Sequence, residues 1–341
     1  MTAKNFSRRS FVKSSAFGAG VFALGGPTLH DAPVASSKLP REAWIASVST
    51  EGFRTPTHKE MLKLVLSNVE IVVKHNPDII CFPETFVFSG VNEKMNLNDK
   101  VEFSQEVLSS FADLARENSC YIICPVITSE RNKKYNAAVM LGREGNVMGE
   151  YRKMHPTENE MADGISPGPP DPPVFKTDFG NVGIQICFDI QWNDGWEHLA
   201  KKGAEIVFWP SAFGGGNLIN TKAWSNKYAV VSSTLKGNSK ICDVSGVELA
   251  STGSWQPNWV CSAINLEKAV IHTWPYVRRF PEIQKKYGRR IRIVNFDEEE
   301  YSIIESLSPD VFIKDILKEF NIKTHAEHIA SATQRQLEAR E

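Results

Sequence analysis

The feature that most constrains the fold is an alternation, starting at Glu42, of short β-rich segments with segments of helical periodicity. Residues 57–75 carry apolar side chains at positions 61, 62, 65, 69, 72 and 73, which is helical spacing, and Pro77 ends this helix. The apolar run at 78–82 then predicts a short buried strand. Repeated along the chain, this alternation predicts a layered α/β domain.

The same criteria predict further elements, and a Pro- and Gly-rich stretch at 164–173 predicts a loop. Strands are expected at 44–49, 121–128, 182–186 and 205–209, helices at 103–117 and 196–202, and hairpins at 136–151 and 241–250.

Composition narrows the class of protein. The 341 residues include 39 Lys+Arg and 40 Asp+Glu, a net charge of −1, so a nucleic-acid partner is not expected. Hydrophobic residues make up 42% and charged residues 23%, near the averages for globular proteins, which argues against wholesale disorder. Six Cys are too few for a disulfide scaffold in a chain of this length.

The N-terminal segment has the pattern of a targeting signal. A twin-arginine pair, Arg8-Arg9, is followed by Phe11 and Lys13 and then by a mild apolar stretch at 14–29. This pattern predicts a bacterial Tat signal peptide over residues 1–38, and hence export by the Tat machinery to a periplasmic or extracellular location. A basic tail without a targeting role is the alternative.

Beyond about residue 275 the character of the sequence changes. A basic cluster at 278–290 precedes an acidic run at 297–300, and Ser308 is expected to begin a helix with one apolar face. A mostly polar helix follows from Thr324. We therefore expect a C-terminal helical arm over 276–341 that packs on the domain or on a second subunit, with a basic patch for anionic ligands as the alternative.

Three residues able to do chemistry follow predicted strands. Glu84 follows a buried apolar strand, Lys153 the second strand of a hairpin, and Cys187 another apolar strand. Ligand sites in open α/β sheets lie beyond the carboxyl ends of strands, so these side chains can converge. A carboxylate can act as the base that a thiol needs to become a nucleophile, and an ammonium can stabilise an oxyanion. Each motif alone is weak, since a buried Cys is usually an apolar core residue.

Together, and in this order, the motifs resemble the nitrilase superfamily of carbon–nitrogen hydrolases over roughly residues 42 to 272. This resemblance implies an α/β fold, a four-layer αββα sandwich, with a hydrolase domain over 42–275. It also implies no metal or organic cofactor and assembly into a homodimer or a larger homo-oligomer. The matching segments are Phe82-Pro83-Glu84-Thr85, Tyr151-Arg152-Lys153 and Gly183-Ile184-Gln185-Ile186-Cys187-Phe188-Asp189, supported by 203–211 and 222–226.

The resemblance also implies roles for individual residues. Glu84 would be the general base, Lys153 the oxyanion stabiliser and Cys187 the nucleophile that forms a thioester. The family uses a second glutamate after the lysine, and a Lys-x-x-Pro-Thr-x-x-Glu pattern selects Glu160, with Glu158 as the alternative.

Departures from the family pattern bear on the substrate. Many family amidases for acid-bearing substrates carry Arg four residues after the Cys, but here Gln191 stands there and cannot form a bidentate charged pair. The Trp-Glu that follows the Cys in typical nitrilases is also replaced. We therefore expect an amidase for a neutral or amphipathic small-molecule amide, with a nitrilase or a non-catalytic binding protein as alternatives. The expected substrate-binding residues are Phe188, Gln191, Trp192 and Phe213, with Trp209 and Trp224 as further candidates for the pocket. Of the four aromatic residues Trp192, Trp209, Phe213 and Trp224, we expect at least two to pack in the core instead.

Other motifs are interpreted as structural. Gly164-x-Ser166-x-Gly168 matches a serine-hydrolase elbow, but Pro167 has no N–H to donate and no strand precedes it. Cys120 and Cys124 are expected in the core. His325 and His328 share a helical face, where we expect a solvated surface and no metal site.

Overall fold

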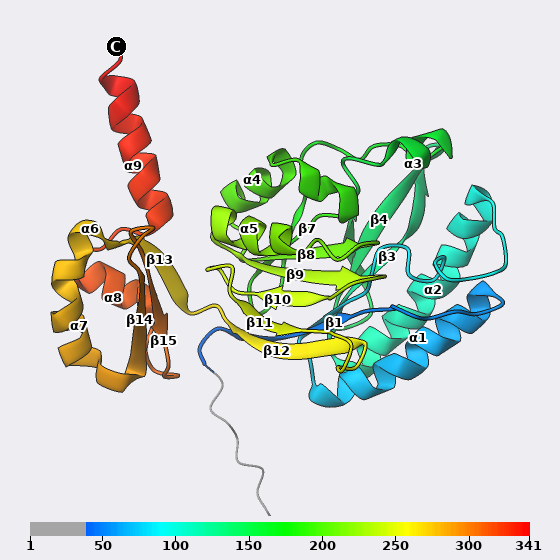
Figure 1. Ribbon diagram of the computed structural model, residues 1–341, viewed down its shortest axis with the longest axis horizontal. Helices are drawn as coiled ribbons and strands as arrows, with labels where there is room; N and C mark the ends of the chain where they lie inside the picture. Colours follow the sequence, from blue (N-terminus) through cyan, green and yellow to red (C-terminus); the bar gives the residue numbers. More distant parts are fainter. Residues whose placement is uncertain (1–38) are drawn as a thin grey trace, which may run out of the picture. The chain divides into compact units, whose positions relative to one another are not determined.

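The computed structural model describes residues 39–341, and the predicted export signal at 1–38 lies outside the described residues. The described part of the chain contains two six-stranded sheets and one three-stranded sheet (Figure 1). None of the helices in that part is both long enough and apolar enough to cross a membrane.

The first sheet has the strand order β12-β1-β2-β3-β4-β5. Its centre, β1-β2-β3, is parallel, and its other neighbouring strands are antiparallel. The strands are β1 (Glu42–Val48), β2 (Ile79–Cys81), β3 (Tyr121–Glu130), β4 (Lys133–Leu141), β5 (Val147–Arg152) and β12 (Trp259–Asn265).

Helices α1 (His58–Val72) and α2 (Leu97–Asn118) cover the outer face of the first sheet (Figure 1). Helix α1 begins at a capping box, in which the Thr57 hydroxyl accepts the Glu60 N–H and the Glu60 carboxylate accepts the Thr57 N–H. The side chain of Asn96 caps α2, which is why this helix begins at Leu97 and not near residue 103 as expected.

The second sheet has the order β11-β10-β9-β8-β7-β6, with a parallel centre at β7-β8-β9. Helices α4 (Asp194–Lys201) and α5 (Asn217–Asn226) pack on its outer face through Trp196, Leu199 and Ile219 (Figure 1). The strands are β6 (Val174–Lys176), β7 (Asn181–Ile184), β8 (Ile206–Ser211), β9 (Ala229–Thr234), β10 (Lys240–Cys242) and β11 (Glu248–Ser251).

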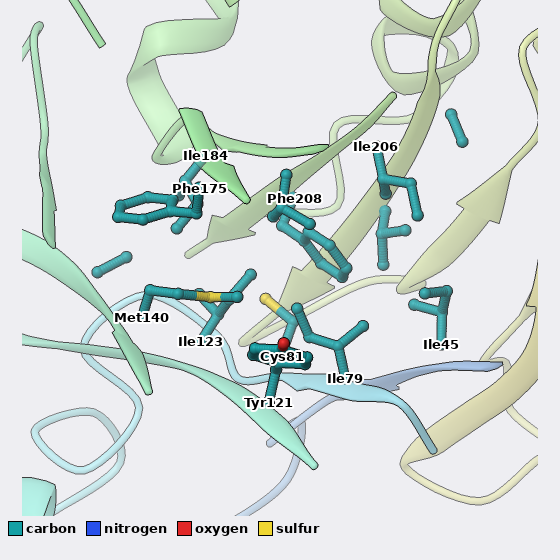
Figure 2. Close-up of a cluster of buried hydrophobic side chains, with 14 of the residues drawn as sticks. Ile45, Ile79, Cys81, Tyr121, Ile123, Met140, Phe175, Ile184, Ile206 and Phe208 are labelled. Carbon is teal, nitrogen blue, oxygen red and sulfur yellow. The ribbon is translucent and has the colours of Figure 1, made fainter. Parts of the chain in front are cut away.

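The inner faces of the two sheets meet in a buried apolar core. Figure 2 shows Ile79, Cys81 and Ile123 of the first sheet in the same cluster as Ile184, Ile206 and Phe208 of the second. Side chains alternate along each strand, so Ile80, between Ile79 and Cys81, packs with the helices of the outer layer. Helices outside and two sheets inside make a four-layer αββα sandwich, which confirms the predicted fold class.

Most of the helices and strands predicted for the sandwich are present, but their first and last residues differ from the predicted ones. Helix α5 and strand β9 were not predicted, because residues 217–234 carry no clear helical or alternating apolar pattern. The short helix α3 (Glu158–Ala162) and a 3-10 turn at Cys187–Gln191 were also not predicted, and both contribute residues to the site described below.

The expectation of a purely helical arm over 276–341 is wrong. The region contains β14 (Ile291–Phe296) and β15 (Tyr301–Ser306), which form a three-stranded sheet with β13 (Lys268–His272) in the order β13-β15-β14. The acidic run at 297–300 is the turn between β14 and β15. The strands were missed because β14 mixes Arg292 and Asn295 with apolar residues of which only Ile291 is buried, and the apolar residues of β15 follow no strict alternation.

Helices complete this C-terminal module around a cluster that includes Ile271, Ile283, Ile304 and Ile316. The helix expected from Ser308 begins later, at Ile313, whereas the final helix begins at its Thr324 cap as predicted. The helices are α6 (Thr273–Tyr276), α7 (Phe280–Tyr287), α8 (Ile313–Glu319) and α9 (His325–Glu338), with 3-10 turns at Val277–Arg279 and Gly288–Arg290.

Candidate active site

Glu84, Lys153 and Cys187 come together at the carboxyl ends of their strands, as the sequence predicts. Glu84 follows β2, Lys153 directly follows β5, and Cys187 opens the 3-10 turn after β7. All three line one cavity of about 390 Å³, within the usual range for small-ligand sites. A larger hollow of about 740 Å³, beside α9, contains none of them.

The Lys153 ammonium lies between two carboxylates. Its Nζ donates to Glu84 Oε1 at 2.8 Å and to Glu160 Oε2 at 2.7 Å. Glu160 is held in place because it also closes the capping box of α3, where its carboxylate accepts the Thr157 N–H at 2.8 Å. Glu158 lies exposed in the first turn of the same helix, so the structure brings Glu160 and not Glu158 to the site.

Asn136 joins the two carboxylates and was not predicted as a site residue. Its Nδ2 donates to Glu84 Oε1 at 2.8 Å and to Glu160 Oε1 at 2.7 Å. We call Glu84, Lys153, Glu160 and Asn136 the Lys153 cluster. The sequence did contain a signal, since the register of the β4–β5 hairpin sets Asn136 opposite Lys153, whose N–H donates to the Asn136 carbonyl.

Burial and charge set the protonation of this cluster. Burial lowers the pKa of Lys153, but Glu84, Cys187 and Glu160 outweigh that effect, and the net pKa is raised, so the ammonium stays charged. Burial raises the pKa of Glu160, but Lys153 and Asn136 outweigh it and the net pKa is lowered. Glu160 is therefore a carboxylate that balances Lys153.

Cys187 is held in a strained turn that presents its thiol to the Lys153 cluster. Its φ of 47° lies in the left-handed region, which is costly for a residue with a Cβ. The Cys187 carbonyl accepts the Trp209 indole N–H at 2.9 Å, which fixes the turn against β8. Burial and the Glu84 carboxylate raise the pKa of Cys187 to about 12, so the resting group is a thiol hydrogen-bonded to Glu84.

A third carboxylate, Asp189, anchors the turn that carries Cys187. Its side chain is fully buried and accepts the Tyr151 hydroxyl at 2.7 Å and the Ile186 and His155 backbone N–H groups at 2.8 Å each. We call Asp189, Tyr151 and His155 the Asp189 cluster. It connects the residues just before Lys153 to the turn that carries Cys187, and none of its members lines the cavity.

The substrate-binding residues expected from the sequence are not where they were predicted. Trp192 stacks on His155 and contacts Phe188 edge-on, and Phe213 packs against the buried Trp209. Trp224 packs against Phe296 and Tyr301 of the C-terminal module. The aromatic residues near Cys187 in sequence thus point into other contacts. Phe188, Gln191, Trp192 and Phe213 are all outside the set that lines the cavity, which is a correction to the prediction.

Residues distant in sequence form the cavity wall instead. Phe88 follows β2, the first turn of α2 contributes Leu97 and Lys100, and Ile127 and Ile165 add apolar surface. This wall could not be predicted from the sequence, because it depends on how the start of α2 packs beside the loop after α3.

The cysteines and histidines for which the sequence predicts no role in the chemistry lie outside the active site. Cys120 and Cys124 are buried, free thiols in the outer core of the first sheet. His328 stacks on His272, with ring centroids 4.9 Å apart. Within residues 39–341, no group of three or more His, Cys, Asp or Glu is arranged to hold a metal ion.

An αββα sandwich with a Glu–Lys–Cys constellation at its strand ends defines a class of thiol-dependent hydrolases. The carbon–nitrogen hydrolase family matches residues 44–271, and the chain belongs to that family. This membership confirms the prediction from the sequence that the chain is a carbon–nitrogen hydrolase.

Curated relatives of this chain are named amidases, and a solved amidase structure shares its fold. A deaminated glutathione amidase from Synechocystis sp. PCC 6803 is 24% identical over 243 residues, covering 62% of this chain and 89% of the relative. The mouse protein of that name is 30% identical over 174 residues, covering 47% and 54%. An amidase of the nitrilase superfamily from Nesterenkonia sp. AN1 matches with a TM-score of 0.60 and 17% identity over 67% of this chain and 92% of its own. At that identity the likeness shows the fold alone.

Proposed function

We propose that this chain is an amidase that hydrolyses a small carboxamide through a thioester on Cys187. The observation that carries the proposal is the buried arrangement in which the Cys187 thiol faces the Glu84 carboxylate, with Lys153 Nζ bound to the same carboxylate at 2.8 Å. The curated amidase relatives support an amide over a nitrile as the substrate.

In the first half of the reaction, Cys187 attacks the amide carbon. The high pKa of the thiol means that it gives up its proton only as the S–C bond forms, and Glu84 accepts that proton. Lys153 and the backbone N–H of Phe188, next in the turn, stabilise the oxyanion of the tetrahedral intermediate. Glu84 then passes the proton to the leaving nitrogen, the C–N bond breaks, and ammonia or an amine leaves a thioester on Cys187.

In the second half, water resolves the thioester. Glu84 takes a proton from the water as its oxygen attacks the thioester carbon, and Lys153 again stabilises the oxyanion. The C–S bond breaks, the thiolate regains the proton, and the acid leaves. Glu160 and Asn136 keep Lys153 and Glu84 in position throughout, since Glu160 accepts from Lys153 at 2.7 Å and Asn136 donates to Glu84 at 2.8 Å and to Glu160 at 2.7 Å.

The test is ammonia release from a panel of aliphatic amides, carbamoyl amines and nitriles, measured for wild type, Cys187→Ala and Cys124→Ala. Cys124 is a matched control, because it is also a buried free thiol but lies in the outer core. We expect amide turnover that disappears in Cys187→Ala and persists in Cys124→Ala. Equal turnover by the folded Cys187→Ala protein would contradict the proposal, and turnover of nitriles alone would replace the amidase by a nitrilase.

We also propose that the protein is exported through the Tat pathway to the periplasm or beyond, on the strength of the Arg8-Arg9 pattern. Replacing both arginines by lysine is expected to leave the protein in the cytoplasm; unchanged export would contradict this. Homodimers or larger homo-oligomers remain a proposal from the family resemblance, which sedimentation velocity tests directly.

A further inference from the structure

A second cavity, of about 740 Å³, lies beside the helices that cover the outer face of the second sheet. Residues of α4, the end of α5, β13 and the start of α9 line it, and we call it the outer cavity. None of the described residues lines both this cavity and the active-site cavity. Its volume is within the usual range for small-ligand sites.

Part of the wall of the outer cavity is apolar. Ala200 of α4, Val270 of β13, and Ala326 and Ile329 of α9 supply this part. Ile329 is 47% exposed, so the start of α9 leaves apolar surface uncovered at the cavity. A ligand with an apolar body can therefore bury surface here.

The wall also carries two lysines without a carboxylate partner. Lys201, in the last turn of α4, and Lys227, directly after α5, both line the cavity, and neither forms a salt bridge within residues 39–341. The neighbouring Lys202 differs, since it pairs with Asp171 and is not part of the wall. The protein neutralises the lysine that points elsewhere and leaves the two lysines of the cavity with their charge.

Lys227 is held by neutral groups. Its Nζ donates to the Trp224 carbonyl at 2.6 Å and lies 3.7 Å from the centroid of the Trp224 ring and 4.1 Å from that of Tyr301. Aromatic faces orient an ammonium without neutralising it. Burial lowers the pKa of Lys227 to about 8, and the charge of Glu299 opposes this shift only in part. An anion in the cavity would stabilise the charged form.

The acidic residue of the wall is occupied with another lysine. Among the described residues that line the cavity, Glu197 is the one carboxylate. Burial lowers the pKa of Lys222, whose Nζ binds neutral oxygen atoms, and the charge of Glu197 opposes that shift. Glu197 therefore balances Lys222, and the charges of Lys201 and Lys227 remain.

The imidazole of the wall, His325, adds no charge at neutral pH. Its ring packs edge-on against Tyr301, with centroids 4.7 Å apart. Burial and the neighbouring Lys227, His272 and His328 lower the pKa of His325 below its ordinary 6.5. The positive charge of the cavity at pH 7 thus comes from the two lysines.

We propose that the outer cavity binds an organic anion, whose head group contacts Lys227 and whose apolar body packs on Val270 and Ile329. Lys227 is the main contact, because its side chain is half-buried and water screens it less than the exposed Lys201. No active-site residue takes part, so this site is independent of whether the chain is an amidase.

The experiment measures, by calorimetry, the binding of three ligands that share one ring system: anionic 1-naphthylacetate, neutral 1-naphthaleneethanol and cationic 1-naphthaleneethylamine. For wild type we expect the acid to bind about tenfold more tightly than the alcohol, with the amine the weakest. Affinity for the acid should fall about tenfold in Lys227→Met and about threefold in Lys201→Met, and rise about twofold in Glu197→Gln. It should also weaken as ionic strength rises from about 0.02 M to about 0.5 M.

Proton uptake is a readout that a change in packing alone would not move. An anion beside Lys227 raises its pKa from about 8, so binding at pH 8 should take up as much as about half a proton. Calorimetry in Tris and in triethanolamine, whose ionisation enthalpies differ, measures this uptake. It should be absent from Lys227→Met; proton release, or uptake that this variant keeps, would overturn the inference.

Two control variants locate the site. Lys202→Met changes the paired lysine outside the wall, and Lys100→Met changes a lysine of the active-site cavity, so both should bind the acid as wild type does. Binding that is lost in Lys100→Met but kept in Lys227→Met and Lys201→Met would place the anion in the active site and overturn the inference. Equal affinity for the acid and the alcohol would do the same. If thermal melting shows that Lys227→Met is unfolded, the exposed Lys201 decides through Lys201→Met.

Discussion

The Lys153 cluster and the Asp189 cluster both place buried carboxylates beside Cys187, but they differ in what neutralises the charge. Glu84 and Glu160 share an ammonium and open onto the cavity. Asp189 has no lysine or arginine partner in the described chain and is satisfied by a hydroxyl, two backbone N–H groups and the His155 ring. A carboxylate close to a nucleophile thus serves the reaction only where it can exchange a proton with the cavity. A carboxylate saturated with donors serves the scaffold.

The largest expected effect is on activity, through Glu84→Gln in the Lys153 cluster. Losing the general base should lower kcat by about 10²- to 10⁴-fold. The Glu84 charge raises the pKa of Cys187, so its removal should lower that pKa from about 12 and make the thiol easier to ionise. Iodoacetamide labelling of Cys187 across pH, followed by mass spectrometry, measures this shift.

A lower kcat together with a Cys187 thiol that ionises more easily distinguishes a general base from a structural residue. A folded Glu84→Gln protein that keeps its amide turnover, or whose alkylation midpoint moves to higher pH, would contradict the role given to Glu84.

The next effect is on stability, through Asp189→Asn in the Asp189 cluster. The amide would point a donor at groups that are themselves donors, so the free energy of unfolding should fall by about 2–4 kcal/mol. Denaturant titration measures the loss. Asp194→Asn is the control, because the Asp194 side chain is half exposed and its Oδ2 lies 3.5 Å from His155 Nε2. If Glu84→Gln destabilised the protein more than Asp189→Asn, the division between the two clusters would be wrong.

A smaller effect compares two glutamates of one short helix. Glu160→Gln removes a charge bonded to Lys153 and Asn136, and we expect kcat to fall about 10- to 100-fold. Glu158→Gln, two positions earlier and exposed, should leave kcat within about twofold. The rate of ammonia release decides between them, and equal losses would mean that the charge of the loop matters and not the contact.

The smallest effect is a pH dependence of stability through His155. The bond to Asp189 raises the pKa of His155 above its ordinary 6.5, so the folded state binds the proton more tightly than the unfolded state. The stabilisation is therefore complete below about pH 6 and is lost as pH rises through the raised pKa. Wild type should exceed His155→Gln by at most about 1 kcal/mol more at pH 5.5 than at pH 9. A difference that grows with pH would contradict the assignment.

How far the sequence predicts the site depends on whether a residue's position follows from its own strand. Glu84 and Cys187 were placed correctly because each ends a parallel strand near the centre of its sheet, where strand ends converge. Lys153 ends an edge strand, and Asn136 opposite it follows from the hairpin register. The sandwich was predictable for the same reason, since its layers follow from local periodicity and from the family motifs.

The cavity wall and the C-terminal module were not predictable from local pattern. Lys100 reaches the cavity only because Asn96 starts α2 early and the loop at Gly164 lies beside its first turn. Phe188 and Trp192 follow the nucleophile in sequence, but the 3-10 turn directs them away from the cavity. Strands β14 and β15 gain their stability from β13 and from helices packed around them, which no short window of sequence shows.

Identifying the covalent intermediate is the most direct test of a thioester on Cys187. Wild-type protein turning over a reactive amide is quenched in acid, and peptides are analysed by mass spectrometry. We expect an acyl mass increment on the peptide that contains Cys187, sensitive to hydroxylamine as a thioester is, and absent from Cys187→Ala. An acyl group on another residue, or continued turnover by Cys187→Ala, would contradict it.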